Sequence, residues 1–339
     1  MTVFCQISMK PCTLLLLSLL TYMTVSGQVV DSHSRDSLAY CEPSIEGAPR
    51  AKGVIVKREI VTNYRIDSSD GQTSQSAEVE INRRWELKAR VPLILRDHLN
   101  VALGINYSVE EFRFENADQL NFPFYKQLES RSLKSLASNL YIVKPFRGNK
   151  YIIARISGSL NGDYEKNSST SQFLKVSITP LLGWKKDPRT GYGARLSLNY
   201  RFGRRTLVPV FFYERMFNQQ WGVEMLLPVM FKLRYGSVNQ KNYWSFKTEL
   251  NDNNYNIDLK EDGSFLFLNK SEVRFLVSYE REIHDWLWLG VESGLRANFN
   301  FDLTDSPARG TDPVIANSFN EAFVFNFSVF LVPPRKFFE

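Results

Sequence analysis

Histidine is the side chain of this sequence best suited to act as a general base, and only three copies occur, His33, His98 and His284. Hydrolases, including lipid hydrolases at a membrane surface, commonly pair a histidine with a serine nucleophile. His98 and His284 fall in short polar connections, and neither a Gly-x-Ser-x-Gly element nor a His-x-Ser pair accompanies them. Only His33 has serines close by, Ser34 and Ser37. Ordinary turn histidines are therefore favoured, no catalytic residue is predicted, and a lipid hydrolase or deacylase is kept as the alternative.

Oxygen-bearing side chains that could hold calcium gather in two segments, Asn251–Asn254 and Asp302–Asp312. Neither segment matches an EF-hand, because no glutamate closes the series at the required offset. We expect solvated loop residues there and predict no metal and no other cofactor. Of the three cysteines, Cys5 and Cys12 lie in the leading apolar segment, so Cys41 alone remains and no internal disulfide is predicted. A lipid anchor on Cys41 is disfavoured because the bulky Tyr40 precedes it.

The charge pattern argues against a nucleic-acid partner. The chain carries 42 Lys and Arg against 36 Asp and Glu, a net charge of +6. The cations alternate with acids and form no basic stripe interleaved with aromatic residues. Two small clusters, 185–189 and 201–205, fall at predicted strand ends, where their cations could meet anionic lipid headgroups. Solubilising turn charges explain the same clusters equally well.

The first 27 residues have the composition of a cleaved signal peptide. One cation, Lys10, is followed by the apolar run CTLLLLSLLTYMTV and by small residues up to Gly27. The run is too short for a membrane-spanning helix, which needs about 20 residues. We predict a signal peptide over 1–27, a polar lead over 28–50 and one domain over 51–339, exported from the cytoplasm.

Nearly all of the predicted domain alternates with period two, as strands with one apolar and one polar face do. In 78–91, Val79, Ile81, Trp85, Leu87, Ala89 and Val91 alternate with charged or amide residues. The segments 192–202, 272–280 and 287–301 repeat the pattern. Several of the predicted strands run 12 to 17 residues. They are longer than the five or six residues of an ordinary strand and long enough to cross a membrane when tilted, which takes about 9 to 11 residues. Short and long connections also alternate along most of the chain, as in an outer-membrane barrel.

The sequence predicts an all-β fold, a single antiparallel transmembrane β-barrel with both termini on one side. Thirteen candidate strands can be drawn, but such a barrel needs an even number. The miscount must lie between about 203 and 242, where Pro209 and Pro228 interrupt predicted strands. We predict twelve strands, with fourteen as the alternative. The candidate strands are 53–67, 77–95, 100–114, 132–146, 150–161, 171–185, 191–203, 207–215, 221–235, 243–257, 270–283, 286–301 and 319–332.

In such a barrel the polar strand faces point into the lumen, and mixed charges in a small bore predict a partly filled interior rather than a wide porin. Aromatic residues near strand ends would form girdles at the membrane interfaces. The predicted lumen-facing residues are Glu78, Glu80, Arg84, Glu86, Lys88, Arg90, Glu272, Arg274, Glu280, Glu292 and Arg296. The predicted girdle consists of Trp184, Trp221, Trp244, Trp286 and Trp288.

Four stretches carry a resemblance to a known family: LASNLYIVKPF (136–146), LLGWKKD (181–187), VPVFFYERMFNQQWGVEMLLPVMFKLRY (208–235) and VSYEREIHDWLWLGVESGLRANFNF (277–301). They resemble an uncharacterised family of outer-membrane β-barrels known only as a domain of unknown function. The likeness covers roughly 54–331, and the Asn-Gln-Gln-Trp turn with the Leu-Leu-Pro that follows is its most specific part. The resemblance implies a fold and a location, but no reaction, ligand or catalytic residue.

Three functions are compatible with these features. The first is a non-catalytic outer-membrane barrel in contact with membrane lipid, acting as a narrow channel, a small-solute transporter or a structural envelope component. The second is an outer-membrane lipid hydrolase or deacylase. The third is a secreted soluble β-sandwich that binds a ligand or a surface. The sequence names no protein partner and no oligomeric state.

Overall fold

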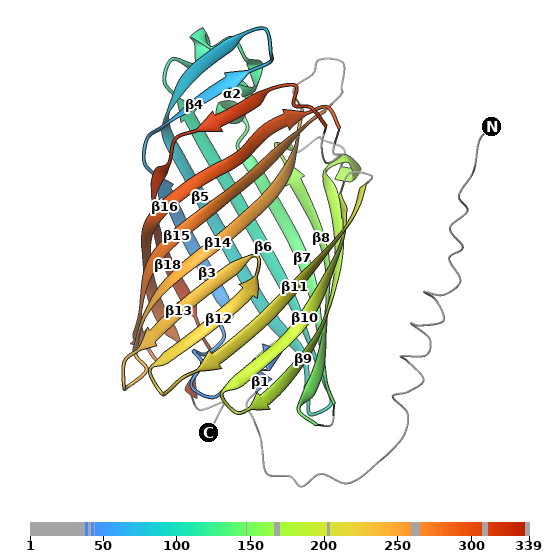
Figure 1. The fold of residues 1–339 in the computed structure, drawn as a ribbon, viewed down its shortest axis with the longest axis vertical. Helices are drawn as coiled ribbons and strands as arrows, with labels where there is room; N and C mark the ends of the chain where they lie inside the picture. The colour runs from blue at the N-terminus through green and yellow to red at the C-terminus, as the bar shows by residue number, and fades with distance from the viewer. Residues whose placement is uncertain are drawn as a thin grey trace, which may run out of the picture. The chain divides into compact units, whose positions relative to one another are not determined.

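The computed structural model is a closed antiparallel β-barrel (Figure 1). It describes residues 38–39, 42–43, 45–146, 148–165, 170–201, 204–258, 265–306 and 311–335. The predicted signal peptide and His33 lie outside these ranges. Among the described residues, no helix has both the length and the apolar character needed to cross a membrane.

Fourteen strand positions form the wall, in the order β5, β3, β18, β16, β15, β14, β13, β12, β11, β10, β9, β8, β7, β6, and β6 pairs with β5 to close the ring. The strands of the wall are β3 (Val54–Val61), β5 (Ser74–Arg96), β6 (Leu99–Phe114), β7 (Leu133–Phe146), β8 (Lys150–Gly162), β9 (Leu174–Asp187), β10 (Thr190–Arg201), β11 (Arg204–Met216), β12 (Trp221–Leu227), β13 (Met230–Gly236), β14 (Asn242–Ile257), β15 (Leu266–His284), β16 (Leu287–Thr304) and β18 (Ala322–Leu331).

Two further strands extend the wall upward at the seam between β3 and β18. β4 (Tyr64–Ser69) continues the line of β3 and pairs with the upper part of β5, while β17 (Ala316–Phe319) continues the line of β18 and pairs with β4. A separate two-stranded ribbon, β1 (Leu38–Ala39) with β2 (Glu42–Pro43), precedes the barrel. The turns at the lower end in Figure 1 are short and the long connections lie at the upper end, although the β12–β13 turn on the upper side is also short.

The structure gives the alternative strand number, fourteen, rather than twelve. The segment that looked like one strand over 221–235 is the hairpin of β12 and β13, which turns at Pro228 and Val229. Val229 donates its amide hydrogen to the Leu226 carbonyl at 2.6 Å, which closes the turn. Proline removes a ladder donor, so it ends the strand where the sequence placed the ambiguity. With seven residues each, β12 and β13 reach only part of the way up the wall.

An irregularity in β5 corrects one part of the predicted strand pattern. The register between β5 and β6 shifts between Val79 and Ile81, which inserts one extra residue. Above the shift Val79 is buried and Glu78 and Glu80 are exposed; below it Asn82 points inward and is buried. Because side chains alternate with period two, one extra residue exchanges the two faces. The prediction that Glu78 and Glu80 face the lumen is therefore wrong.

A hydrophobic plug fills the upper end of the barrel. The connection between β6 and β7 contains the 3₁₀ turn η1 (Ala117–Gln119) and the short helix α2 (Pro123–Ser130), which was not predicted. Phe124, Tyr125 and Leu128 of α2 are at most 1% exposed. They belong to one large apolar cluster with residues of the surrounding strands, among them Ile66, Val79, Phe112, Phe114, Tyr255, Leu268, Phe301 and Leu303.

The lower mouth is crossed by the segment that leads into β3. The Glu46 amide donates a hydrogen bond to the Pro188 carbonyl, at the β9–β10 turn, at 2.6 Å. Four residues later, Arg50 binds Asp285, at the β15–β16 turn, at 3.0 Å. These two turns belong to strands that are far apart in the ring, so the chain between them spans the opening. Ile45, at the start of this segment, is buried.

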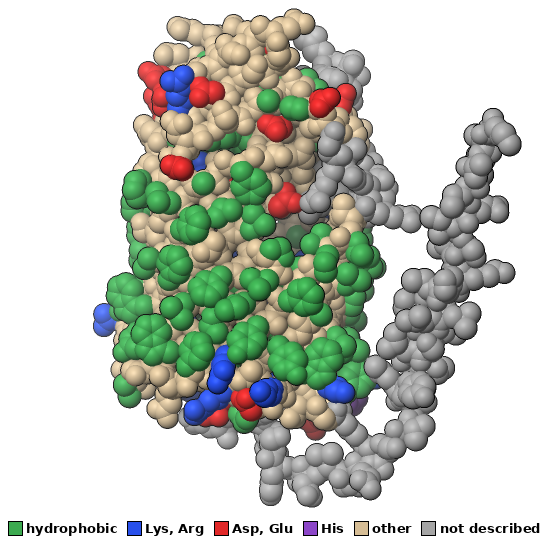
Figure 2. All heavy atoms as spheres, in the orientation of Figure 1, with side chains coloured by type: hydrophobic (Ala, Val, Ile, Leu, Met, Phe, Trp, Pro, Cys, Tyr) green, Lys and Arg blue, Asp and Glu red, His purple; other side chains and the backbone are tan. Residues whose placement is uncertain are grey.

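The outer surface is apolar over most of the barrel height. Phe211, Phe299 and Phe323 project outward with 56 to 62% of their surface exposed, and many Leu, Ile and Val side chains do the same. Figure 2 shows them as a belt that covers the lower and middle parts of the molecule, while polar and acidic side chains dominate above it. A contiguous apolar surface of this extent is not compatible with water as its only surroundings.

Candidate functional site

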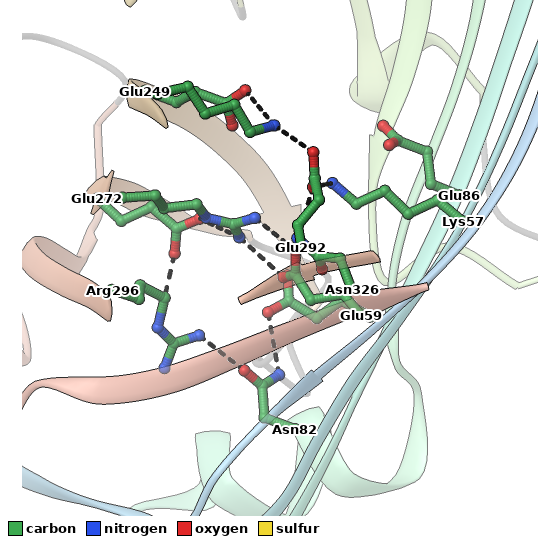
Figure 3. A network of polar contacts seen from close by, with 12 residues as sticks. Lys57, Glu59, Asn82, Glu86, Glu249, Glu272, Glu292, Arg296 and Asn326 are labelled. Carbon is green, nitrogen blue, oxygen red and sulfur yellow. Dashed lines mark hydrogen bonds and ion pairs between the residues drawn. The ribbon is translucent and has the colours of Figure 1, made fainter. Parts of the chain in front are cut away.

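Below the hydrophobic plug, the lumen is filled by a buried network of charged side chains (Figure 3). At its centre the Arg274 guanidinium contacts both carboxylate oxygens of Glu59, at 2.5 and 2.8 Å, and donates from Nε to Glu272 at 2.7 Å. Lys270 binds Glu110 at 2.5 Å. All five side chains are at most 4% exposed. Lys270, Glu272 and Arg274 are two residues apart on β15, so the alternation of the strand places all three on its inner face.

Arg296 and Asn82 complete this inner network. Arg296 donates to Asn82 at 2.8 Å, and Asn82 donates in turn to Glu110 at 3.0 Å. Arg296 also lies 4.6 Å from the ring centre of Tyr64, at the base of the plug. Three carboxylates and three cations thus balance one another in a region that excludes solvent. Charges removed from water are tolerated only when they are paired and hydrogen-bonded, so the network is expected to be rigid.

A second, less buried group of charges lies nearer to the lower end. Lys247 binds Glu292 at 2.7 Å and Glu249 at 2.9 Å, and Lys57 approaches Glu292 at 3.5 Å. Asn326 donates to the same Glu292 carboxylate at 2.9 Å. Figure 3 shows Glu249 on one side and Lys57 on the other, with Glu292 between them.

A central cavity of about 330 Å³ adjoins both groups of charges. Its cationic lining comes from Lys52, Lys57, Arg84, Lys88, Lys247 and Arg274, and its acidic lining from Glu59, Glu86, Glu249 and Glu292. Four apolar residues at or beside the tip of the β12–β13 hairpin form one side: Leu226, Val229, Met230 and Leu250. The volume is at the lower end of the range that small-molecule sites occupy.

A second cavity, of about 250 Å³, lies between the inner faces of β7 to β10 and the upper part of β14. We call it the side cavity. Its lining is almost entirely hydrophilic and includes four serines, Ser135, Ser157, Ser159 and Ser177. Asn161 and Asn199 add amides, Arg155 and Lys175 add positive charge, and Asp252, Asn253 and Asn254 come from β14.

The upper end of the site is joined to the plug through Asp163, which follows β8. Its carboxylate accepts a hydrogen bond from Gln127 of α2 at 2.6 Å and one from the Asp258 amide at 3.2 Å. Burial raises the pKa of the Asp163 carboxyl. Asp163 therefore links α2, β8 and the end of β14.

The structure places nine of the eleven predicted lumen residues on the inner face and Glu78 and Glu80 on the outer face. Glu272, Arg274 and Arg296 belong to the buried network. Arg84, Glu86, Lys88 and Glu292 line the central cavity. Glu280 binds Lys52 at 2.6 Å, and Arg90 lies 5.2 Å from the ring centre of the buried Tyr141.

The five predicted girdle tryptophans fall into two groups. Trp221, Trp244 and Trp286 are 43 to 51% exposed near the lower turns, and Trp184 stacks on Tyr192 at 6.0 Å close to the same end. Trp288 is 4% exposed and stacks on Tyr243 and Phe330 inside the barrel. The assignment of Trp288 to a girdle is wrong because β16 alternates in the other phase, with Leu289 outside.

Trp244 points out of the barrel and Trp288 points into it, so the two side chains should respond differently to membrane lipid. In single-tryptophan variants with Phe at the other tryptophan positions, we expect brominated phospholipid to quench the fluorescence of Trp244 strongly and that of Trp288 weakly. Quenching requires contact with the acyl chains, and only Trp244 points outward. Equal quenching of the two would contradict a lipid-facing lower ring.

The residues that suggested chemistry are not brought together. His98 lies in the β5–β6 turn and His284 ends β15, beside Trp286, and no hydrogen bond of either histidine to a described serine is found. Asn251–Asn254, weighed as a calcium site and expected to be solvated, is part of β14, as the predicted strand 243–257 implied, and it lines the two cavities. Within the described residues, no group of three or more His, Cys, Asp or Glu side chains is arranged to hold a metal.

Sequence reasoning missed the plug, although a signal for it was present. Pro123 stands at the first turn of a helix, where proline is favoured, and Phe124 and Leu128 are four residues apart on one face. The polar residues around this short amphipathic segment make the connection look solvated, which hides the helix in the sequence.

A sequence profile for one protein family matches residues 62–329 of this fold, which include most of the barrel wall and the whole buried network. The chain belongs to the DUF6268 family. That family is described as a domain of unknown function, which confirms the resemblance found in the sequence. No curated protein matches the sequence.

Solved structures that resemble this DUF6268 member include porins and transporters. The NanC porin is 9% identical over 83% of this chain and 100% of its own, with a TM-score of 0.34. The toluene transporter TodX of Pseudomonas putida is 8% identical over 83% and 90%, with a TM-score of 0.38. The β domain of the Bordetella autotransporter BrkA is 11% identical over 84% and 100%, with a TM-score of 0.27. At these values no residue of one protein can be matched to a residue of another.

Proposed function

We propose that this DUF6268 member is a non-catalytic protein of the bacterial outer membrane that transports small solutes. The apolar outer belt supports a position in lipid, and short turns at one end with long connections at the other are typical of bacterial outer-membrane barrels. The predicted signal peptide supplies the route of export.

The observation that carries the transport function is the presence of two polar cavities inside a barrel whose ends are both obstructed. A purely structural barrel of this size has no need of internal space lined by charges and hydroxyls. A wide, permanently open pore is equally poorly supported, because the plug and the buried network fill the upper half of the lumen. Neither His98 nor His284 is hydrogen-bonded to a described serine, so these two histidines give no support to lipid hydrolysis.

Transport is tested by reconstitution. We expect proteoliposomes that contain the refolded, heat-modifiable barrel to take up a six-carbon polyol and to exclude long polyethylene glycols, because the cavities are small. Stopped-flow light scattering measures both rates. A folded barrel that admits neither solute would contradict transport and favour a structural role, whereas passage of the long polymers would contradict the obstructed lumen. A phospholipase assay of the same samples is expected to give no product.

A further inference from the structure

The barrel wall is incomplete above the β12–β13 hairpin. β11 pairs with β12 only from Phe211 to Met216, and β13 pairs with β14 only as far as Glu249. One more hydrogen bond, from the Leu250 amide to the Val229 carbonyl at 2.8 Å, caps the hairpin tip. Above this level no strand of the described residues lies between the facing edges of β11 and β14. Figure 2 shows a hollow in the surface of this side of the molecule, near the upper edge of the apolar belt.

The upper part of β14 stays paired with β15, and its other edge approaches β8, which lies beyond β11, β10 and β9 in the strand order. Asn256 of β14 pairs with Gly162 of β8, and its side chain donates to the Gln172 carbonyl in the turn η2 (Thr170–Phe173) at 2.8 Å. Only glycine allows this approach, because a Cβ at position 162 would lie 2.2 Å from the Asn256 carbonyl oxygen. The inner faces of β8 to β10 therefore line a space beside β14 rather than the plugged upper lumen.

The same stretch of β14 lines both cavities. Glu249, Leu250 and Asn251 border the central cavity, and Asp252, Asn253 and Asn254 border the side cavity. The two cavities therefore follow one another along a single strand edge, which begins at the hairpin tip. This edge offers a route between the lumen and the outside that avoids the plug.

Both cavities carry an excess of positive charge. The central cavity has six cationic and four acidic residues in its lining, and the side cavity has two cationic and one acidic. Most of the cations are neutralised by neighbours: Lys52 by Glu280, Lys88 by Glu86, and Arg274 by Glu59. Arg84 and Arg155 make no ion pair with any described residue, and the buried Nε of Arg155 has no hydrogen-bond partner there. Each cavity thus holds one guanidinium with no described carboxylate within ion-pair distance, although Glu59, Glu86 and Glu110 lie close enough to Arg84 to interact with it electrostatically. A carboxylate is the group that arginine recognises best.

We propose that small hydroxylated anions, such as sugar acids, pass between the lumen and the exterior through the gap between β11 and β14, with Arg84 and Arg155 as successive anion contacts. The inference rests on the proposed transport function and specifies its route and its class of solute. The serines and asparagines of the side cavity suit the hydroxyl groups of such a solute, and the two arginines suit its carboxylate.

Selectivity is tested with three solutes of similar six-carbon polyol skeleton and different charge: gluconate, sorbitol and N-methylglucamine. We expect wild-type proteoliposomes to admit gluconate fastest and N-methylglucamine slowest. Arg84→Met and Arg155→Met keep the apolar stem and remove the charge. Each should lower the gluconate-to-sorbitol rate ratio about fourfold, the effect of one unit charge roughly 5 Å from the solute in a water-like dielectric. Arg58→Met is the matched control, because Arg58 lies on the outer face of β3 over Trp85.

The route is tested by sealing the wall. Inserting Val-Thr after Leu227 and Thr-Val before Met230 lengthens the hairpin so that β12 and β13 can pair further up β11 and β14. We expect this variant to fold, as judged by heat-modifiability, and to lose uptake of all three solutes. The control carries the same four residues in the exposed β13–β14 turn at Val238, which is 81% exposed, and should transport normally.

The outcomes separate the two proposals. If the wild type admits none of the three solutes, transport itself fails, and the route fails with it. If the wild type transports but the folded, sealed variant transports equally well, the lateral route is wrong and transport stands. If sealing abolishes uptake while neither arginine variant changes the rate ratio, the proposed anion contacts are wrong. Should the sealed variant not fold, Val229→Trp, which places bulk at the hairpin tip, provides the same comparison.

Discussion

Replacing Arg274 by alanine is expected to lower the free energy of unfolding by about 3–5 kcal/mol, the usual cost of removing one partner from a buried ion pair. Arg274 contacts both oxygens of Glu59 and one of Glu272, and all three side chains are almost fully buried. Without the guanidinium, two carboxylates are left in the lumen with too little positive charge. Urea unfolding of the refolded barrel in detergent micelles measures the loss.

Two companion variants show whether the loss comes from uncompensated charge. Arg65→Ala removes an exposed pair with Asp67 and should cost less than about 1 kcal/mol. Adding Glu59→Gln to an Arg274→Met background should recover part of the stability, because the network then loses one charge of each sign. An Arg274→Ala barrel as stable as Arg65→Ala would show that the network does not hold the lumen together.

Truncating Phe124 to alanine is expected to weaken the docking of α2 by about 3–5 kcal/mol, the typical cost of removing a buried phenylalanine side chain. Phe124 is fully buried, and its ring centre lies 4.1 Å from that of Tyr125. Because the effect is local, it should appear first as opening of the β6–β7 connection. At about 1.4 kcal/mol per factor of ten, the undocked population should rise at least roughly a hundredfold.

Limited proteolysis of the refolded barrel reports this opening at the aromatic residues of α2. Glu129→Ala is the control, because Glu129 lies on the exposed face of the same helix and should leave the cleavage rate unchanged. Equal cleavage of the two variants would show that α2 is not a docked plug. Uptake of polyols by the Phe124→Ala barrel should also remain close to wild type if solutes pass through the side gap.

The architecture was largely predictable, because the side chains of a barrel strand alternate between the two faces of the wall and the sequence therefore alternates between apolar and polar residues. Trp85 and Leu87 face outward and Glu86 and Lys88 inward, as their alternation indicated. What a regular period cannot reveal is an interruption of the period itself. The extra residue between Val79 and Ile81 exchanges the faces of Glu78 and Glu80, and nothing in the residue types there marks a bulge. At Pro228 the residue type did mark a break, but whether the chain bends or reverses depends on its neighbours in space.

The site was predictable only as a set of residues, not as an arrangement. The inward position of Glu272, Arg274 and Arg296 follows from alternation, whereas their pairing with Glu59 and Glu110 requires knowing which walls of the barrel face each other. The role of Asn251–Asn254 was missed for a different reason. The predicted strand 243–257 contained them, but four consecutive polar residues look solvated, and nothing in the sequence shows that one edge of this strand pairs with β15 while the other borders the cavities.

The seam between β3 and β18 joins the first strand of the wall to the last one that the structure describes. Arg50, before β3, and Arg335, after β18, both bind Glu282 and Asp285, so the segments on either side of the seam share one acidic anchor. Without β18 in place, β3 and β16 would each present an unpaired edge, which hydrocarbon does not tolerate. Opening the seam in a bilayer therefore exposes two strand edges at once, and we expect the shared anchor to keep the seam closed by holding both segments to the same turn.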